Sequence, residues 1–407
     1  MKDKTMLTLH DSEIDFNIKK LIQIFGEPNI EQALKKYNKS MLLSPPIYRE
    51  FHLIGLHPWF HGLNSYLQAK KKGKSIKRHL TDELIQIAND SCKLQQIFRE
   101  APSEIKAKFR KDLLDPESAR AYLFEINIAS KFKHKGFNID WELGKNIKIP
   151  EFSIYNPEVF YDKIQIECKL IKHDKTKKIK RKDFYNFCDK LLFKLAKFKV
   201  SGEIQIKTFD KFPSNTEKQN DIAHYIFDLI KNKNLKGQYR TDNFVVSLNI
   251  AIDQNILANL DKLYQEMLTK RPHNAEACIF ASSKNHIPKN PISIICESAK
   301  SGNVLKGIKD EITGALKTQL IKNKSSIVFC HLSEIDDFEV LSKNSGLSNL
   351  ADYILNNKDY RNLHSLVFSS DLKLTQRGAI KFGHSPIIQF YNTNCEPNFE
   401  LRLVEKR

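Results

Sequence analysis

Apolar side chains recur at three- and four-residue spacing through the first quarter of the chain, as they do on one face of an α-helix. Leu84, Ile87 and Ala88 begin one such stripe, and Leu94 continues it. We therefore expect residues 1–112 to form a helical N-terminal region.

A further helix is predicted from Pro116 to Lys135. Asp115 supplies a cap before it, and Gly136 is a residue type that ends helices. Glu125 falls on the apolar stripe of this helix. A carboxylate directed toward a core is costly unless it is paired or binds a cation. The alternative is a glutamate at the rim of the core whose carboxylate reaches water. The other stripe positions are Ala121, Phe124, Ile128, Ala129 and Phe132.

Beyond Gly136 the segments become short and rich in Ile and aromatic residues, which predicts strands. The expected order is three strands, a helix and a fourth strand: 137–143, 150–155, 163–171, 183–199 and 203–209. Further strands are expected at 244–252, 277–281, 292–297, 327–332 and 363–369, with a helix at 303–322. The fold class is therefore α/β. The predicted parts are the helical region 1–112, a core at 113–212 and an α/β C-terminal domain at 213–407.

The third predicted strand carries charged residues on one face. Alternation places Ile164 and Ile166 on the apolar face and Gln165, Glu167 and Lys169 together on the other. A carboxylate that binds a divalent cation, beside an amine that acts on water, is what phosphodiester hydrolysis needs. An ion pair on an exposed strand is the alternative. Cys168 is turned to the apolar face, which favours a core position over a nucleophile.

The order of these residues is informative. Glu125 lies on a helix, Pro150-Glu151-Phe152 begins the second strand, and Glu167-Cys168-Lys169 lies on the third. This arrangement resembles the PD-(D/E)XK nuclease superfamily, which has the restriction-endonuclease-like fold, over about residues 113–210. The resemblance implies that Glu151, Glu167 and the Cys168 carbonyl bind Mg²⁺, for which Mn²⁺ could substitute. Glu125 would be an outer or second-metal ligand, and Lys169 would act on the attacking water.

The chain departs from the family at one position, because Glu151 stands where the family usually has Asp. Asp140 and Asp162 are alternative ligands, although neither lies in the Pro-acid-Phe setting.

The charge balance suggests a polyanionic partner, since 66 basic and 48 acidic residues give a net charge of +18. A Lys-rich bias from an AT-rich genome would give the same excess. Seven basic residues follow the motif strand and form either a phosphate-binding clamp or a solvated loop. They are Lys172, Lys175, Lys177, Lys178, Lys180, Arg181 and Lys182. Gln205 and Lys207 on the predicted fourth strand are expected to line the site.

Other features are less informative. The seven cysteines include no Cys-x-x-Cys pair, which fits a reducing cytoplasm, and no apolar stretch predicts a membrane helix. His57 and His61 flank Pro58, so packing is expected rather than metal binding. Glu297 and Lys300 close another strand, but no matched upstream carboxylates precede them.

The sequence thus predicts a magnesium-dependent nuclease, with DNA preferred to RNA as substrate and with a role in restriction or in defence against foreign DNA. A non-catalytic nucleic-acid-binding protein on the same fold and an RNase are the alternatives. Monomer, homodimer and complex with a partner subunit all remain open.

Overall fold

The structure is a computed structural model of the chain. It describes residues 11–74, 81–142, 150–158, 160–172, 177–196, 198–252, 275–284, 287–300, 304–321, 324–333, 345–371, 373–377, 380–384 and 386–393, together with the single residues 302, 338, 341 and 395.

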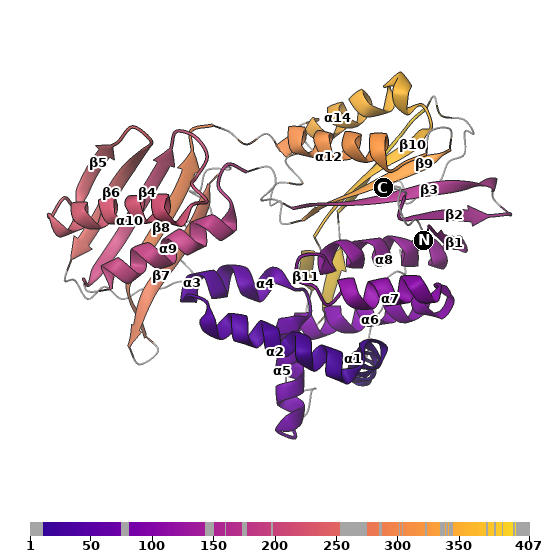
Figure 1. The fold of residues 1–407 in the computed structure, drawn as a ribbon, viewed down its shortest axis with the longest axis horizontal. Helices are drawn as coiled ribbons and strands as arrows, with labels where there is room; N and C mark the ends of the chain where they lie inside the picture. Colours follow the sequence, from indigo (N-terminus) through magenta and orange to yellow (C-terminus); the bar gives the residue numbers. More distant parts are fainter. Residues whose placement is uncertain are drawn as a thin grey trace. The chain divides into compact units, whose positions relative to one another are not determined.

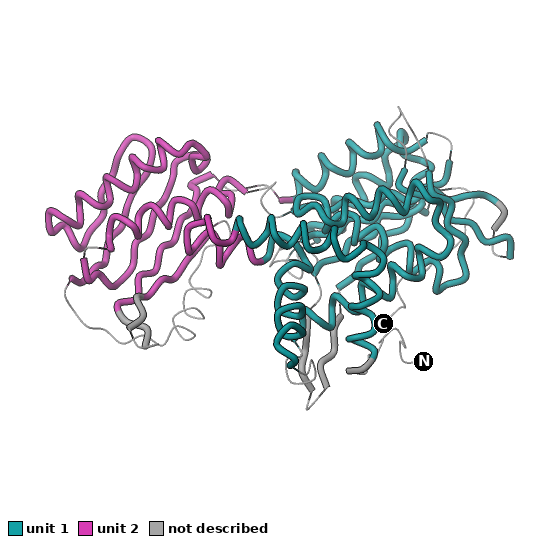
Figure 2. Tube along the Cα trace, turned by 60° about the horizontal axis from the view of Figure 1, so that its bottom comes forward, with its two compact units in different colours: residues 1–40, 55–173, 305–407 teal, residues 41–54, 174–304 magenta. Residues whose placement is uncertain are grey.

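The chain divides into two compact units, coloured separately in Figure 2. Unit 1 comprises residues 1–40, 55–173 and 305–407, and unit 2 comprises residues 41–54 and 174–304. These limits differ from the predicted boundaries after 112 and 212. Unit 2 is built from two insertions into unit 1: the chain leaves unit 1 at residue 41 and again after the motif strand, and returns to it each time.

The N-terminal region is helical, as the apolar spacing predicts, and its described residues contain no strand. Helices α1 and α6 pack through buried residues that include Ile18, Leu21 and Ile87. The helical elements are α1 (Asp11–Phe25), α2 (Glu27–Leu43), α3 (Pro46–Tyr48), a π-helical turn (Arg49–Leu53), α4 (Ile54–Leu56), α5 (Phe60–Lys71), α6 (Asp82–Glu100) and α7 (Ser103–Asp112).

Unit 1 contains a six-stranded mixed sheet. Its order is β1 (Asn138–Trp141), β2 (Phe152–Asn156), β3 (Phe160–Lys172), β9 (Ser326–Ser333), β10 (Leu363–Ser370) and β13 (Ile387–Tyr391). Neighbours β1, β2 and β3 are antiparallel, whereas β3, β9 and β10 are parallel. Strand β13 is antiparallel to β10. A separate hairpin is formed by β11 (Lys373–Arg377) and β12 (Ile380–His384).

Helices cover both faces of this sheet (Figure 1). Helix α8 (Ala119–His134) lies against one face, where Phe132 meets Phe329 of β9 edge to face at 5.9 Å. It ends at Gly136, whose φ of +84° is the left-handed conformation that glycine adopts readily. Helices α12 (Val304–Thr318) and α14 (Gly346–Leu355) lie on the opposite face, and a 3₁₀ turn (Lys358–Tyr360) precedes β10.

Unit 2 has its own five-stranded mixed sheet. The order is β5 (Lys236–Arg240), β6 (Phe244–Ile252), β4 (Val200–Thr208), β8 (Ile287–Ser298) and β7 (Glu276–Lys284). Helices α9 (Arg181–Leu195) and α10 (Thr216–Lys231) bury their apolar sides in a core with Ile204 and Ile206 of β4. Gly202 is required on β4, because a Cβ there would lie 2.1 Å from the Asn249 carbonyl oxygen on β6.

The predicted assignment of the helix 183–199 and the strand 203–209 to the same core as the motif strand is wrong. These segments form α9 and β4, and β4 pairs with β6 and β8 in unit 2. The parallel neighbour of β3 is β9 instead. Apolar alternation identifies a strand but not its partner, and a parallel partner can lie far along the chain because it needs a crossover connection.

Candidate active site

The centre of the candidate site is the charged pair on β3. The Lys169 ammonium lies 2.5 Å from Glu167 Oε1, and the Glu167 side chain is fully buried whereas that of Lys169 is 18% exposed. Both point away from Ile166 and Cys168, which belong to the core under α8. The alternation of β3 therefore places Glu167 and Lys169 in one space, as the sequence predicts.

The second carboxylate oxygen of Glu167 has no hydrogen-bond partner among the described residues. Burial raises the pKa of Glu167, the Lys169 ammonium lowers it, and the Glu151 charge raises it again, giving a value of about 7. A buried anionic oxygen without a donor is costly, so this atom is suited to receive a cation.

Glu125 is held on α8 in the position that its apolar stripe predicts. Its side chain is buried, and its helix contacts β9 through Phe124 and His331, whose rings lie 5.1 Å apart. Burial raises the pKa of Glu125 well above its usual range, and the Glu151 carboxylate adds to this rise. Glu167 contributes in the same direction. The pKa of Glu125 therefore responds to the charges of both other candidate carboxylates.

Glu151 immediately precedes β2 and is half-buried. Its amide donates a hydrogen bond to the Ile166 carbonyl at 3.1 Å, which places Glu151 alongside the motif segment of β3. Burial raises the pKa of Glu151, while the ammonium groups of Lys108 and Lys169 lower it. Glu151 is thus in the electrostatic neighbourhood of Glu125, Glu167 and Lys169.

Lys169 is a stable cation in this setting. Burial lowers the pKa of its ammonium, but the carboxylates of Glu167 and Glu151 outweigh burial and raise the pKa above its usual value. Lys169 can therefore donate hydrogen bonds and offset negative charge, and it is a weak proton acceptor while both carboxylates are ionised.

Lys108 and Tyr122 also interact electrostatically with the candidate carboxylates, although no pattern in the sequence singles them out. Lys108 of α7 is exposed, and its ammonium lies 5.1 Å from the ring centre of Tyr122 on α8. Burial and a hydrogen bond to Asp112 raise the pKa of Tyr122, and the charges of Glu125 and Glu151 raise it further. Tyr122 lies one helical turn before Glu125, and this spacing could have indicated a shared surface.

The other predicted site residues lie elsewhere. Asp140 pairs with Lys163, and Asp162 is exposed, so neither replaces Glu151 in the carboxylate cluster. Gln205 and Lys207 belong to unit 2, where Lys207 pairs with Glu297 at 3.0 Å. The expectation that these two residues lie on a strand of the motif sheet is wrong, because β4 belongs to the other sheet.

The basic segment after β3 is not uniformly available to a polyanion. The Lys177 ammonium is buried and lies 2.7 Å from Glu276, and Arg181 contacts the same carboxylate at 3.6 Å. Lys177 is therefore a structural cation rather than a phosphate contact, and the prediction for it is wrong. Lys172 pairs with Glu117 at 3.7 Å. Lys180 and Lys182 are exposed, Lys178 is half-buried, and Lys175 lies outside the described residues.

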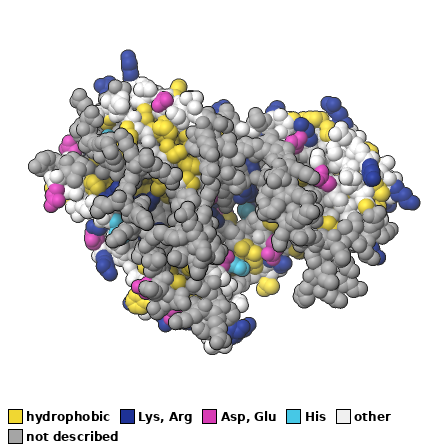
Figure 3. Space-filling view, turned by 180° about the vertical axis from the view of Figure 1, so that it is seen from behind, with side chains coloured by type: hydrophobic (Ala, Val, Ile, Leu, Met, Phe, Trp, Pro, Cys, Tyr) yellow, Lys and Arg dark blue, Asp and Glu magenta, His cyan; other side chains and the backbone are white. Residues whose placement is uncertain are grey.

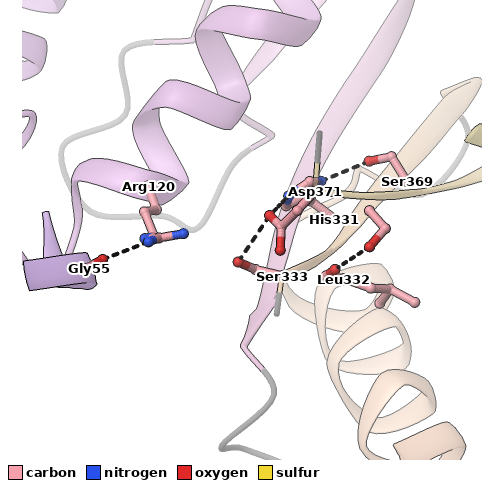
Figure 4. A network of polar contacts seen from close by, with 8 residues as sticks. Gly55, Arg120, His331, Leu332, Ser333, Ser369 and Asp371 are labelled. Carbon is pink, nitrogen blue, oxygen red and sulfur yellow. Dashed lines mark hydrogen bonds and ion pairs between the residues drawn. The ribbon is translucent and has the colours of Figure 1, made fainter. Parts of the chain in front are cut away.

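His331 organises a separate polar network at the ends of β9 and β10 (Figure 4). One ring nitrogen lies 3.0 Å from Ser369 Oγ, and the other lies 3.0 Å from Asp371 Oδ1. Ser333 also donates to Asp371, at 3.4 Å. Because both ring nitrogens are engaged, His331 is held in place and has no free nitrogen for a substrate. His57, also singled out in the sequence, is buried and bonded through Nε2 to the Leu113 carbonyl, as packing predicts.

Within the described residues, no group of three or more His, Cys, Asp or Glu side chains is arranged to hold a metal ion. In the same part of the chain, none of the helices has the length and apolar character to cross a membrane. On the face shown in Figure 3, the Lys and Arg side chains of described residues are spread singly and form no continuous stripe. Comparisons with protein families, curated proteins and solved structures give no match to this chain.

Proposed function

We propose that this protein is a metal-dependent nuclease with a restriction-endonuclease-like core in unit 1. The order expected of that core is helix, three strands, helix and strand. The elements α8, β1, β2, β3, α12 and β9 follow this order, with unit 2 inserted between β3 and α12. The parallel pairing of β3 with β9 supports this assignment, because β9 then takes the place of the fourth strand.

One observation carries the functional proposal. The pKa values of Glu125, Glu151 and Glu167 are all raised, the charge of Lys169 acts on each of the three, and Glu167 keeps a buried oxygen without a donor among the described residues. Such an excess of buried negative charge destabilises a fold unless a cation compensates it. Carboxylate oxygens are the ligands preferred by Mg²⁺ and Mn²⁺. The carboxylates of Glu151 and Glu167 thus supply donor atoms of the type that a hard divalent cation takes.

The residues would divide the work as follows. Glu151, Glu167 and the Cys168 carbonyl would hold the cation, with Glu125 as an outer ligand or a ligand to a second ion. When bound, the cation would offset the negative charge of the phosphate and activate a water molecule. Lys169, held as a cation by Glu167, would orient the attacking water and stabilise the negative charge that develops on the phosphate oxygens. Glu167 thus has two roles, in holding the cation and in fixing Lys169.

We propose DNA as the substrate and defence against foreign DNA as the setting. The net charge of +18 supports a polyanionic partner, and Lys180 and Lys182 remain exposed candidates for backbone contacts. The cysteine pattern, which lacks Cys-x-x-Cys pairs, supports action in a reducing cytoplasm.

Cleavage of labelled DNA and RNA in Mg²⁺, in Mn²⁺ and in EDTA tests the proposal. We expect cutting of DNA that needs the metal and is abolished in Glu167→Ala and in Lys169→Ala. The matched controls are Lys207→Ala and Glu297→Ala, which break a chemically similar pair on the other sheet. Cutting at the wild-type rate by either β3 variant would refute the site. Metal-independent binding without cutting would favour the non-catalytic alternative, and cutting of RNA alone would make the protein an RNase.

A further inference from the structure

We propose that one face of the β5–β6 hairpin in unit 2 binds double-stranded DNA, in the major groove and on the flanking phosphates. This ribbon face consists of Lys236, Gln238 and Arg240 of β5 with Ser247 and Asn249 of β6. The inference goes beyond the proposed function, because it assigns a binding surface outside the candidate active site and does not depend on cutting.

Strand pairing places the side chains of the ribbon face on the same side of the sheet. Strands β5 and β6 are antiparallel, and Gln238 lies opposite Ser247. Alternation turns the intervening residues, such as Tyr239 and Leu248, to the other side, where they contact the core beneath α9 and α10. Figure 1 shows both helices on one side of this sheet. The ribbon face is therefore on the side that α9 and α10 leave uncovered.

The side chains of the ribbon face are available to a ligand. Lys236, Gln238, Arg240 and Asn249 are exposed, and Ser247 is half-buried. Within the part of the chain that the structure describes, none of these five side chains makes a hydrogen bond or an ion pair. Their donors and acceptors can therefore engage a partner without first breaking a contact inside the protein.

The charge of this region favours a polyanion. Unit 2 holds 24 basic and 15 acidic residues, so its net charge of +9 is half of the +18 of the whole chain, in little more than a third of the length. Lys236 and Arg240 give the ribbon face two positive charges and no negative one. On the next strand, β4, Glu203 accepts a hydrogen bond from a glutamine of the same strand. Lys207 pairs with Glu297 at 3.0 Å, so it is not one of the proposed contacts.

The shape and chemistry of the ribbon face fit the major groove of a duplex. That groove is about 12 Å wide and admits a two-stranded ribbon. Gln238 and Asn249 carry carboxamides, which can both donate to and accept from the edges of bases. The ribbon face has no aromatic side chain, whereas single strands are bound by the stacking of bases on aromatic rings. A duplex is therefore the better partner.

The two cations are spaced to contact phosphates of the DNA backbone. Lys236 and Arg240 are four residues apart on one face, which is about 14 Å along a strand. Phosphates repeat at about 3.4 Å of helix axis in each DNA strand, so the two cations span about four base pairs. The Arg240 guanidinium lies 5.0 Å from the ring centre of Phe209, which restrains its position and leaves its N–H donors available.

Helix α10 offers a matched pair of lysines. Lys218 and Lys231 are exposed and lie at the two ends of α10, on the helical side of the same unit. The double variants Lys236→Gln, Arg240→Gln and Lys218→Gln, Lys231→Gln lower the net charge equally and keep long side chains. A difference between the two variants therefore reports the position of the charges and not their number.

The test measures the affinity of the full chain for a labelled duplex of mixed sequence at several salt concentrations, in EDTA so that metal-dependent cutting does not occur. We expect the ribbon-face double variant to lose about tenfold in affinity, and its slope of log affinity against log salt to fall by about two. The α10 double variant should keep its slope and change affinity by less than about twofold. Gln238→Glu with Asn249→Asp keeps the side-chain shapes but adds negative charge, so it should weaken binding by about tenfold or more.

Equal affinities and equal slopes for the two double variants, with unchanged thermal unfolding, would overturn the ribbon face as the DNA surface. Tighter binding of a single strand of the same length would overturn the duplex as its occupant. An equal loss of affinity for a polyglutamate peptide would also overturn the proposal, because the face would then recognise an acidic protein.

The proposed function is tested separately by cleavage in Mg²⁺. Cutting that depends on Glu167, together with equal binding by the two double variants, would refute the ribbon face and keep the nuclease. Duplex binding through the ribbon face without any cutting would refute catalysis and keep the ribbon face. If the wild-type protein does not bind duplex DNA, the ribbon-face proposal is overturned.

Discussion

The Lys169 ammonium lies 2.5 Å from the Glu167 carboxylate on β3, a strand paired on both sides within the sheet of unit 1. The positions of such a central strand usually carry apolar side chains, because helices cover both faces. A buried ion pair seldom adds net stability, since the desolvation of two charges offsets their attraction. This cost supports the proposal that the pair has a chemical role.

The first prediction concerns Glu125, which is buried beside Glu151. Glu125→Gln removes an ionisable carboxyl group and keeps the shape of the side chain. In EDTA we expect it to raise the free energy of unfolding by about 1 kcal/mol, because ionising a buried carboxyl beside other carboxylates is costly, and to impair cleavage in Mg²⁺. Urea unfolding and cleavage rates measure the two effects. A variant that is less stable and fully active would show that Glu125 is a structural residue.

The second prediction is a pH dependence set by Glu167. Its pKa is about 7 in the folded protein and near the usual 4.5 in the unfolded chain. The folded state binds more protons between these values, so the free energy of unfolding of the metal-free protein should fall as pH rises from about 4.5 to about 7. The contribution of Glu167 is at most about 3 kcal/mol.

The same protonation should oppose metal binding. We expect kcat/KM in Mg²⁺ to decline as pH falls below about 7, because a proton on Glu167 competes with the cation. Calorimetry in buffers of different ionisation enthalpy would detect proton release on Mg²⁺ binding. A flat activity profile from pH 5 to pH 8 would contradict this assignment.

The third prediction addresses Glu151, the position at which the chain departs from the resembled family. Glu151→Ala should be inactive, whereas Glu151→Asp should keep part of its activity, more in Mn²⁺ than in Mg²⁺. Mg²⁺ demands near-octahedral geometry with short bonds, so a displaced oxygen weakens it more. Cleavage rates of both variants in each metal provide the measurement. An active alanine variant would remove Glu151 from the site.

The fourth prediction separates two kinds of lysine in the basic segment. Lys177→Ala leaves Glu276 partly uncompensated in the interior and should destabilise the protein by about 3 kcal/mol. The double variant Lys180→Ala, Lys182→Ala should change stability by less than about 0.5 kcal/mol.

If Lys180 and Lys182 contact phosphates, their removal should flatten the salt dependence of DNA binding by about two in slope. Thermal unfolding and binding titrations at several salt concentrations check both parts. An unchanged slope would leave these lysines as solvated side chains.

The sequence by itself determined the local elements of the site. The apolar stripe and Gly136 predict α8 and its end at His134, but the predicted start is wrong: the helix begins at Ala119 after Ser118, not at Pro116 after Asp115. Alternation predicts the shared face of Glu167 and Lys169. These features depend on residues two to four positions apart in the chain, so the local order of apolar and polar residues is enough to predict them.

Only the tertiary structure decided which elements belong together. It pairs β3 with β9 rather than with β4, gathers 174–304 into a separate unit and buries Lys177 against Glu276. The sequence of an alternating strand is the same whichever strand it pairs with. Nor does the sequence distinguish a lysine in a buried ion pair from a lysine on the surface. These choices depend on which distant segments bury the most apolar surface while keeping charges compensated, and that balance is a property of the whole chain.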